Sequence, residues 1–380
     1  MWKLPDTVAR RFPLIARPRP ACLPLPQRIH ALAELADTAA RQGDASVAST
    51  VYNQAALIAS DVGAPDAART LCHQHAAAYL HAAPLPGKTA IRALEPVVNL
   101  ARLQIRAGQY DNGRRQLLAL FDAVSTSAPI QVEDVAVPAE LIATAEDRQE
   151  VRAWLWRVLL ADGARALTAA GRWTEALAHV EAHHGVGQRM FDGRQIAVLA
   201  AIAEGNSDRA AELLEHTKPD EQWEHAVTVC LTLLCSRAAG QSIDESLEDV
   251  LSAVLGRQAE PGLSVFDNRL GLTVLDAIGC TGHPSAHRVA EHLADRALLA
   301  LDGYVAREVL THPICAPLIP NQQAQHCRDL VNACALGTHP FPEALCGELA
   351  AALRMSDRVI RAAMRGPAGS SQRRQASIRR

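Results

Sequence analysis

The chain has 380 residues, of which 49% are hydrophobic and 21% charged, and this composition excludes a wholly disordered protein. Aromatic residues make up only 4%, so the core must be built from alanine and aliphatic side chains, which suits close-packed helices better than β-sandwiches. The net charge of −3 and the pI near 6.6 indicate neither nucleic acid nor a membrane surface as a partner. We therefore predict an all-α protein.

Six prolines lie in the first 27 residues, which we expect to form an extended arm or a strap packed on the rest of the molecule. Proline has no backbone N–H and disrupts a helix interior, so no long helix is expected there. The basic side chains of this segment give it a charge of about +4.

From Ile29 onward, apolar residues recur at the spacing of helices. The first predicted helix runs from Ile29 to Gly43, and the second runs from Val47 to Gly63. Further helices are predicted at about residues 65–82, 91–107, 110–126, 146–170, 173–184, 192–204, 207–216, 221–239, 243–255, 265–279, 284–300, 304–311, 321–335 and 341–364. No segment shows a convincing alternation with the period of two that indicates a β-strand.

Two segments depart from the helical pattern. Residues 125–145 contain two prolines and several β-branched residues and predict an inserted loop. Residues 366–380 carry a charge of about +4 and predict a disordered tail. We therefore divide the chain into an arm (1–27), helical repeats (28–255), a C-terminal helical extension or cap (256–365) and the tail; the sequence leaves open whether the C-terminal helices continue the array or cap it.

Glycines at the predicted turns recur with a nearly constant spacing. Gly171, Gly205 and Gly240 are 34 and 35 residues apart, and Gly43 and Gly108 lie at similar turns. A period near 34 residues predicts stacked helical hairpins.

Small side chains follow these glycines where the two helices of a hairpin must touch. Ala48, Ala176 and Ala210 each lie five residues after a glycine, and Tyr52 and Ala55 complete a small, large, small pattern. In this pattern residues 28–255 resemble the tetratricopeptide-repeat family. The resemblance implies an α-solenoid of antiparallel hairpins, a right-handed superhelix whose first helices line a concave groove that holds peptide segments of other proteins.

In this register, groove-facing positions precede each glycine by six and by two or three residues. These positions hold Asp37, Arg41, Arg102, Arg106, Arg165, Thr168 and Arg237. Because the planar guanidinium suits carboxylates and phosphates, we expect the groove to bind an acidic segment or a C-terminal carboxylate. The alternative is that arginine is simply the solvated residue of this proteome, since 35 of the 38 basic residues are arginines, a bias that with the alanine content predicts a bacterial source.

A second group of candidate residues lies in the C-terminal third. It consists of His312, Cys315, His326, Cys327, Cys334, His339 and Cys346. The gap between His312 and Cys315 is typical of zinc ligands, but a zinc site needs four converging ligands, usually two such close pairs, and a second clean pair is missing. We therefore assign no metal and no cofactor, and we expect most of these cysteines to be buried small hydrophobes.

No nucleotide-binding loop, GxSxG motif or HExxH motif occurs, so we predict a protein without catalytic activity. We expect an interaction scaffold. No apolar stretch typical of a signal peptide follows the basic start of the chain, so we place the protein and its nine cysteines in the cytoplasm. Its partner is a protein or peptide, with no direct nucleic-acid contact and no membrane span. Two alternatives stay open: an effector-sensing regulatory protein that acts through a DNA-binding partner, and a thiol or zinc enzyme.

Overall fold

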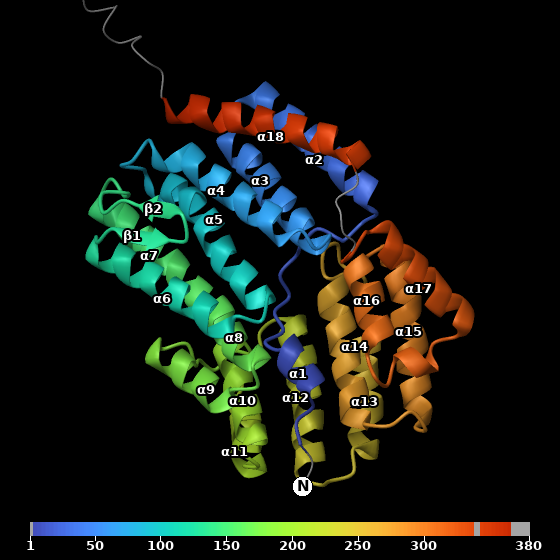
Figure 1. Ribbon diagram of the computed structural model, residues 1–380. Helices are drawn as coiled ribbons and strands as arrows, with labels where there is room; N and C mark the ends of the chain where they lie inside the picture. Colours follow the sequence, from blue (N-terminus) through green and yellow to red (C-terminus); the bar gives the residue numbers. More distant parts are fainter. Residues whose placement is uncertain (1–2, 338–342, 366–380) are drawn as a thin grey trace, which may run out of the picture. The chain divides into compact units, whose positions relative to one another are not determined.

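The structure is a computed structural model that describes residues 3–337 and 343–365, and it is an all-α fold (Figure 1). The contacts within the chain divide it into two compact units. Among the described residues, unit 1 contains residues 3–25, 107–114 and 156–336, and unit 2 contains residues 26–106, 115–155, 337 and 343–365. The predicted division at residues 255 and 256 stays a prediction, and the predicted tail lies outside the described residues.

Unit 2 is built from helices near the start of the chain and one from its end. They are α2 (Leu25–Gln42), α3 (Ala45–Asp61), α4 (Pro65–Leu80), α5 (Gly87–Arg106), most of α6 (Tyr110–Thr126), most of α7 (Ala145–Val158) and α18 (Glu343–Met364). Helix α4 packs against both α3 and α5, and α18 packs on α3 and α4. Val51, Ala55 and Ile58 lie at helical spacing on α3 and are buried, which is why this helix has a packing face.

The inserted loop predicted at residues 125–145 contains a β-hairpin, so the expectation of no strand is wrong at this place. Strand β1 (Ile130–Val132) pairs antiparallel with β2 (Val135–Val137). Val132, Val135 and Val137 are buried, whereas Gln131 and Ala136 are exposed. The alternation of a strand is therefore present, but each strand has only three residues, too few to distinguish from a loop in the sequence.

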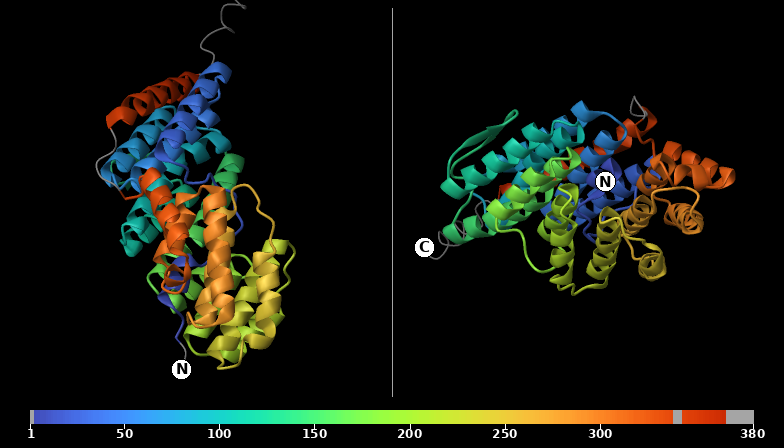
Figure 2. Two further views of the ribbon diagram at one scale, coloured as in Figure 1. Left: turned by 90° about the vertical axis from the view of Figure 1, so that its right-hand side faces the viewer. Right: turned by 90° about the horizontal axis from the view of Figure 1, so that it is seen from below.

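Unit 1 is a series of helices that contact one another in chain order. They are α8 (Ala164–Ala169), α9 (Trp173–Ala182), α10 (Asp192–Ala203), α11 (Ser207–Glu215), α12 (Gln222–Ala238), α13 (Asp244–Leu255), α14 (Ser264–Ile278), α15 (Pro284–Ala300), α16 (Gly303–Thr311) and α17 (Asn321–Ala333). Each even-numbered helix packs against the odd-numbered helix that follows it, and α10, α12, α14 and α16 also contact one another in that order (Figures 1 and 2). An array of stacked hairpins requires this pattern of contacts. A tetratricopeptide-repeat identity and a right-handed superhelix stay predictions.

The predicted turn glycines lie between helices, as expected. The φ angles of Gly43, Gly108, Gly171, Gly205 and Gly240 lie between +66° and +79°. A residue with a Cβ pays a steric cost in this left-handed region, so glycine ends the preceding helix. The three alanines placed at hairpin contacts, Ala48, Ala176 and Ala210, are fully buried, which confirms the predicted packing.

The helix predicted at residues 146–170 is not continuous. A single π-helical turn, Leu159–Gly163, separates α7 from α8. His179 on α9 places its Nε2 atom 3.0 Å from the Leu159 carbonyl oxygen, and a Cβ atom on Gly163 would lie 2.8 Å from that nitrogen. The altered turn and the missing side chain thus make room for a buried histidine from the neighbouring helix.

Residues 3–24, here called the strap, cross unit 1. The strap contains one short helix, α1 (Asp6–Arg11), so the predicted arm is not extended throughout, although it holds no long helix. Val8, Phe12, Leu14 and Cys22 are buried, which agrees with a strap packed on the molecule. Helix α1 packs on α8 and α14. Within the described ranges, no helix combines the length and the apolar character needed to cross a membrane.

Candidate peptide-binding surfaces

Two of the predicted groove residues, Arg102 and Arg106, lie at the end of α5 and line one cavity of about 410 Å³ in unit 2. Helices α3, α4, α5 and α7 provide the rest of its lining, which consists of Asn53, Ala56, Leu57, Ser60, Cys72, Glu95, Asn99, Leu103 and Trp154. The cavity therefore combines an apolar wall with polar side chains from two neighbouring helices.

A continuous row of hydrogen bonds links four polar residues of this lining. Asn53 on α3 donates from Nδ2 to Glu95 Oε2 at 2.8 Å and accepts at Oδ1 from Asn99 Nδ2 at 3.1 Å. Asn99 in turn accepts at Oδ1 from Arg102 Nη1 at 3.0 Å. Glu95, Asn99 and Arg102 follow one another at helical spacing on α5, so a single helix face presents them. Arg102 is exposed and donates to the last amide of this row.

One turn beyond the row, α5 is connected to α3 by an ion pair of Arg106. Arg106 Nη1 donates to Ser60 Oγ at 2.8 Å and to Asp61 Oδ1 at 3.0 Å. Asp61 also accepts from Arg28 Nη2 at 2.7 Å, so two arginines share this buried carboxylate. The Arg106 side chain remains 49% exposed and faces solvent at the cavity.

Burial raises the pKa of two groups in the cavity. Desolvation raises the pKa of Glu95, and the hydrogen bond from Asn53 opposes this change. Desolvation raises the pKa of the Cys72 thiol to about 12, with a contribution from the Glu133 charge. The Cys72 thiolate is therefore disfavoured at neutral pH.

In unit 1, two other predicted groove residues bind the strap through its backbone. Thr168 Oγ1 on α8 donates to the Phe12 carbonyl oxygen at 3.0 Å. Arg165 Nη2, one turn earlier, donates to the Pro13 carbonyl oxygen at 2.8 Å. Two successive strap residues are thus held by main-chain recognition from one helix face.

Gln195 on α10 continues this recognition at the next strap residue. The Leu14 N–H donates to Gln195 Oε1, and Gln195 Nε2 donates to the Leu14 carbonyl oxygen, both at 2.7 Å. The same Nε2 group also donates to the Met190 carbonyl oxygen at 2.9 Å. The buried side-chain amide therefore bonds to both main-chain polar groups of Leu14 in the manner of a neighbouring strand.

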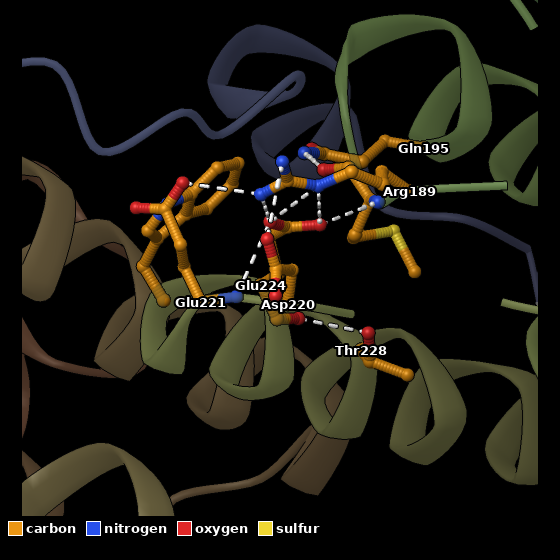
Figure 3. Close-up of polar contacts among 8 residues, drawn as sticks. Arg189, Gln195, Asp220, Glu221, Glu224 and Thr228 are labelled. Atoms are coloured by element: carbon orange, nitrogen blue, oxygen red, sulfur yellow. Dashed lines mark hydrogen bonds and ion pairs between the residues drawn. The ribbon is translucent and has the colours of Figure 1, made fainter. Parts of the chain in front are cut away.

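An acidic cluster fixes the loop that orients Gln195 (Figure 3). Arg189 pairs with Asp220 at 3.4 Å, with Glu221 at 3.1 Å and with the fully buried Glu224 near the start of α12. Glu224 also accepts from the Met190 N–H at 3.0 Å. Burial alone raises the pKa of Glu224, but the hydrogen bonds from Arg189 and Met190 hold it below its ordinary value.

Buried charges bind the other side of the strap. Arg11 pairs with Asp276 on α14, and Thr7 Oγ1 donates to Asp276 Oδ1 at 2.8 Å. His312 Nε2 lies 3.1 Å from the same Oδ1 atom, while its Nδ1 accepts from the Cys315 N–H at 3.2 Å, which places the proton on Nε2. Burial, together with the Arg11 charge, lowers the pKa of His312 to about 3. The histidine is neutral and donates to Asp276.

The last part of the strap lies directly against backbone. The Cys22 carbonyl oxygen accepts from Gly303 N at 2.8 Å and from Cys334 Sγ at 2.9 Å, and Arg19 N donates to the Gly262 carbonyl oxygen at 3.1 Å. A Cβ atom on Gly303 would lie 2.7 Å from Cys334 Sγ, and one on Gly262 would lie 2.9 Å from Arg19 N. Both glycines permit this close approach. We call the surface formed by α8, α10, α14 and α16 around the strap the strap-binding face.

The remaining predicted groove residues do not line the unit 2 cavity. Asp37 and Arg41 are exposed on α2, where Arg41 Nη2 donates to Thr38 Oγ1 at 3.0 Å. Arg237 is half-buried on α12 in unit 1, and its Nη2 atom lies 3.4 Å from the position of a Cβ atom on Gly279. A single groove shared by all seven residues stays a prediction.

The candidate metal ligands of the C-terminal third lie in different environments. His312 uses both ring nitrogens as described above. Cys315, Cys327 and Cys334 are buried, and burial raises the pKa of Cys315 to about 12. His326 and Cys346 are exposed, and His339 lies outside the described residues. Over the described ranges, no three His, Cys, Asp or Glu side chains converge as metal ligands.

Sequence reasoning missed the residues that complete both surfaces. Asn53 and Asn99 lie outside the register positions that we read, and only the packing of α3 beside α5 joins them. Gln195 carries a stronger signal, because it is a polar residue directly before the apolar run that forms the rest of its helix. Asp276 has a similar signal, since it lies near the end of the apolar helix α14.

No family model, curated protein or solved structure matches the chain significantly.

Proposed function

We propose that the protein is a non-catalytic interaction scaffold that binds an extended acidic segment of a partner protein in the unit 2 cavity. The observation that carries the proposal is the row from Glu95 through Asn53 and Asn99 to Arg102, which presents an exposed guanidinium beside an apolar wall. Such a combination suits a peptide, because amide side chains can bond to its backbone while arginines bind its carboxylates.

The two arginines provide the charge for this recognition. A guanidinium has five N–H donors in a plane, so Arg102 can donate to Asn99 and to a ligand carboxylate at the same time. Arg106 lies one helical turn further on and is half exposed. The spacing of four residues places the two groups on one face of α5, where they can bind two acidic groups of an extended segment.

The apolar wall gives the proposed site its second source of affinity. Ala56 and Leu57 on α3 and Leu103 on α5 lie beside the polar row, and the half-buried Trp154 closes the wall from α7. Leu57 remains 37% exposed, which is unusual for a large aliphatic side chain in this protein. An apolar ligand side chain next to the carboxylates would cover this surface.

Binding is favoured over catalysis because the two potential nucleophiles in the cavity, the Cys72 thiol and the Ser60 hydroxyl, are not activated. The Cys72 thiol has a raised pKa, and Ser60 Oγ accepts a hydrogen bond from Arg106. No histidine is among the residues that line the cavity in the described part of the chain. A serine or cysteine without an adjacent base is a weak nucleophile at neutral pH.

A selection from a random peptide library tests the proposal. The purified chain should enrich peptides that carry Asp or Glu beside an apolar residue. The Arg102→Ala, Arg106→Ala double variant should lose this enrichment, and Arg41→Ala should retain it, because Arg41 is exposed in the same unit but does not line the cavity. Enrichment of peptides without acidic residues, or equal enrichment by all three proteins, would contradict an acidic ligand.

A further inference from the structure

We propose that the strap is a displaceable internal ligand, and that the strap-binding face is a second peptide-binding surface for a partner segment with an arginine, an apolar residue, proline and a second apolar residue in succession. Residues Arg11 to Leu14 of this chain have that chemistry. The inference concerns unit 1 alone and does not depend on the function proposed for the unit 2 cavity.

The first support is that unit 1 binds three successive strap residues through their backbone. Thr168 and Arg165 donate to two consecutive carbonyl groups, and Gln195 bonds to both polar main-chain groups of the third residue, Leu14. These bonds involve main-chain atoms of a segment that bends at Pro13, so they depend on the path of the chain, and main-chain bonds are how such peptide recognition obtains affinity. A different polypeptide segment that carries proline at the same place can therefore make the same bonds.

The second support is that the side chains of the strap have specific places. Phe12 is fully buried and Leu14 is 2% exposed. Arg11 forms an ion pair with Asp276 of α14. Pockets for alternate side chains give specificity in this type of recognition. The preferred partner therefore has a basic residue followed directly by an apolar one, with proline and a second apolar residue after it.

The third support is the polarity of the surface beneath the strap. Contacts between hairpin helices use small apolar residues such as Ala176 and Ala210, whereas the strap-binding face uses Thr168, Gln195 and Asp276. A permanently closed core gains little from a buried charge pair, because desolvation offsets most of the attraction. A face that is also exposed in its empty state needs side chains that water can solvate.

The covalent connection of the strap allows it to leave. The strap joins the chain of unit 2 at residues 25 and 26, and the helices on which it lies begin only after residue 156. Release of the strap breaks its own contacts but no hairpin contact. Such an opening can occur as a local event, separate from global unfolding.

A labelled peptide with the sequence of residues 3–24, added to the full chain, tests the proposal by fluorescence anisotropy. In the wild-type chain the attached strap competes at an effective concentration of roughly millimolar. The Arg11→Ala chain loses the ion pair between its attached strap and Asp276, whereas the added peptide keeps its arginine. We therefore expect the peptide to bind this variant at least about tenfold more tightly than it binds the wild-type chain. The matched control is Arg10→Ala, since Arg10 is exposed on the same helix; this variant should behave as wild type.

The results of this experiment distinguish a peptide ligand on the strap-binding face from a second copy of the chain. A peptide that itself carries Arg11→Ala should not bind the Arg11→Ala chain. Equal binding to all three chains, or no binding to any, would overturn the proposal. A chain that becomes a dimer and leaves the peptide unbound would assign the face to a second copy and overturn the claim of a separate partner.

Native-state alkylation gives a test that needs no variant. Cys22 in the strap is fully buried, and Cys230 on α12 is 1% exposed in the core of the same unit. If the strap opens locally, Cys22 should react at least about tenfold faster than Cys230 under native conditions. Equal rates would show that the strap opens only when the whole unit unfolds, which would overturn the proposal.

Discussion

Gln195 is the residue on which the backbone recognition of the strap depends most. Its side chain makes three hydrogen bonds, two of them to Leu14, and it is fully buried. Gln195→Leu keeps the size of the side chain but leaves buried main-chain groups without partners. We expect the variant to lose about 2 to 5 kcal/mol of unfolding free energy, measured by urea titration. Gln241→Leu, at an exposed position, is the control, and an equal loss in both variants would contradict this account.

His75 gives unit 2 a defined dependence of stability on pH. It is buried and stacks on Tyr52 with ring centroids 5.0 Å apart, and burial lowers its pKa from 6.5 to about 3. Between these values the unfolded chain binds a proton that the folded chain does not, so the free energy of unfolding falls as the pH falls from 6.5 towards 3.

His75→Phe should retain the stacking and remove this proton linkage. As the pH falls from about 6 to about 4, the unfolding free energy of the variant should decrease less steeply than that of the wild type. The two slopes should differ by about 1.4 kcal/mol per pH unit. Urea titrations at several pH values measure the two slopes. Identical slopes would show that His75 does not resist protonation in the folded chain.

At the scale of elements, the close contact between α8 and α9 depends on a small side chain. Ala176 on α9 is fully buried in a cluster with Ala164 and Leu167 of α8. Ala176→Leu should lower the unfolding free energy by about 1 to 3 kcal/mol, because the enlarged side chain displaces tightly packed neighbours. Ala182→Leu, on an exposed position of the same helix, should melt like the wild type. Similar melting temperatures for both variants would mean that the hairpin register is wrong.

The helices and their turns could be predicted because each has a local cause. Glycines such as Gly171 and Gly205 end helices through a backbone angle that other residues avoid, and apolar spacing marks the packing face. The interruptions have non-local causes. The π-helical turn before α8 accommodates His179 from another helix, and the hairpin at Ile130–Val137 depends on a pairing between strands too short to show a period.

For the candidate surfaces, the sequence identified charges but not their neighbours. Arg102 and Arg106 were predicted from the repeat register and do line one cavity. Arg165 and Thr168 came from the same register, yet their polar atoms bind the carbonyl groups of the strap. The strap reaches them across more than 150 positions of sequence, and no local pattern encodes a contact over that separation.

At the scale of the whole molecule, the two proposed peptide-binding surfaces lie in different units. The two surfaces should respond to different substitutions. Substitutions at Arg102 and Arg106 should weaken the binding of an acidic ligand and leave the strap in place, whereas Arg11→Ala should loosen the strap and leave the acidic ligand bound. Equal effects of both changes on both ligands would contradict two separate surfaces.

The most direct test of the scaffold function is a calorimetric titration of the tightest acidic peptide from the library selection. The Arg102→Ala, Arg106→Ala double variant should bind this peptide about 2 to 4 kcal/mol more weakly than the wild type, which corresponds to roughly 30- to 1,000-fold in Kd. Its helical content should not change, and binding to the wild type should weaken as salt increases. A double variant that binds the peptide as tightly as the wild type, with the same salt dependence, would contradict the proposal that the α3 and α5 cavity holds an acidic segment.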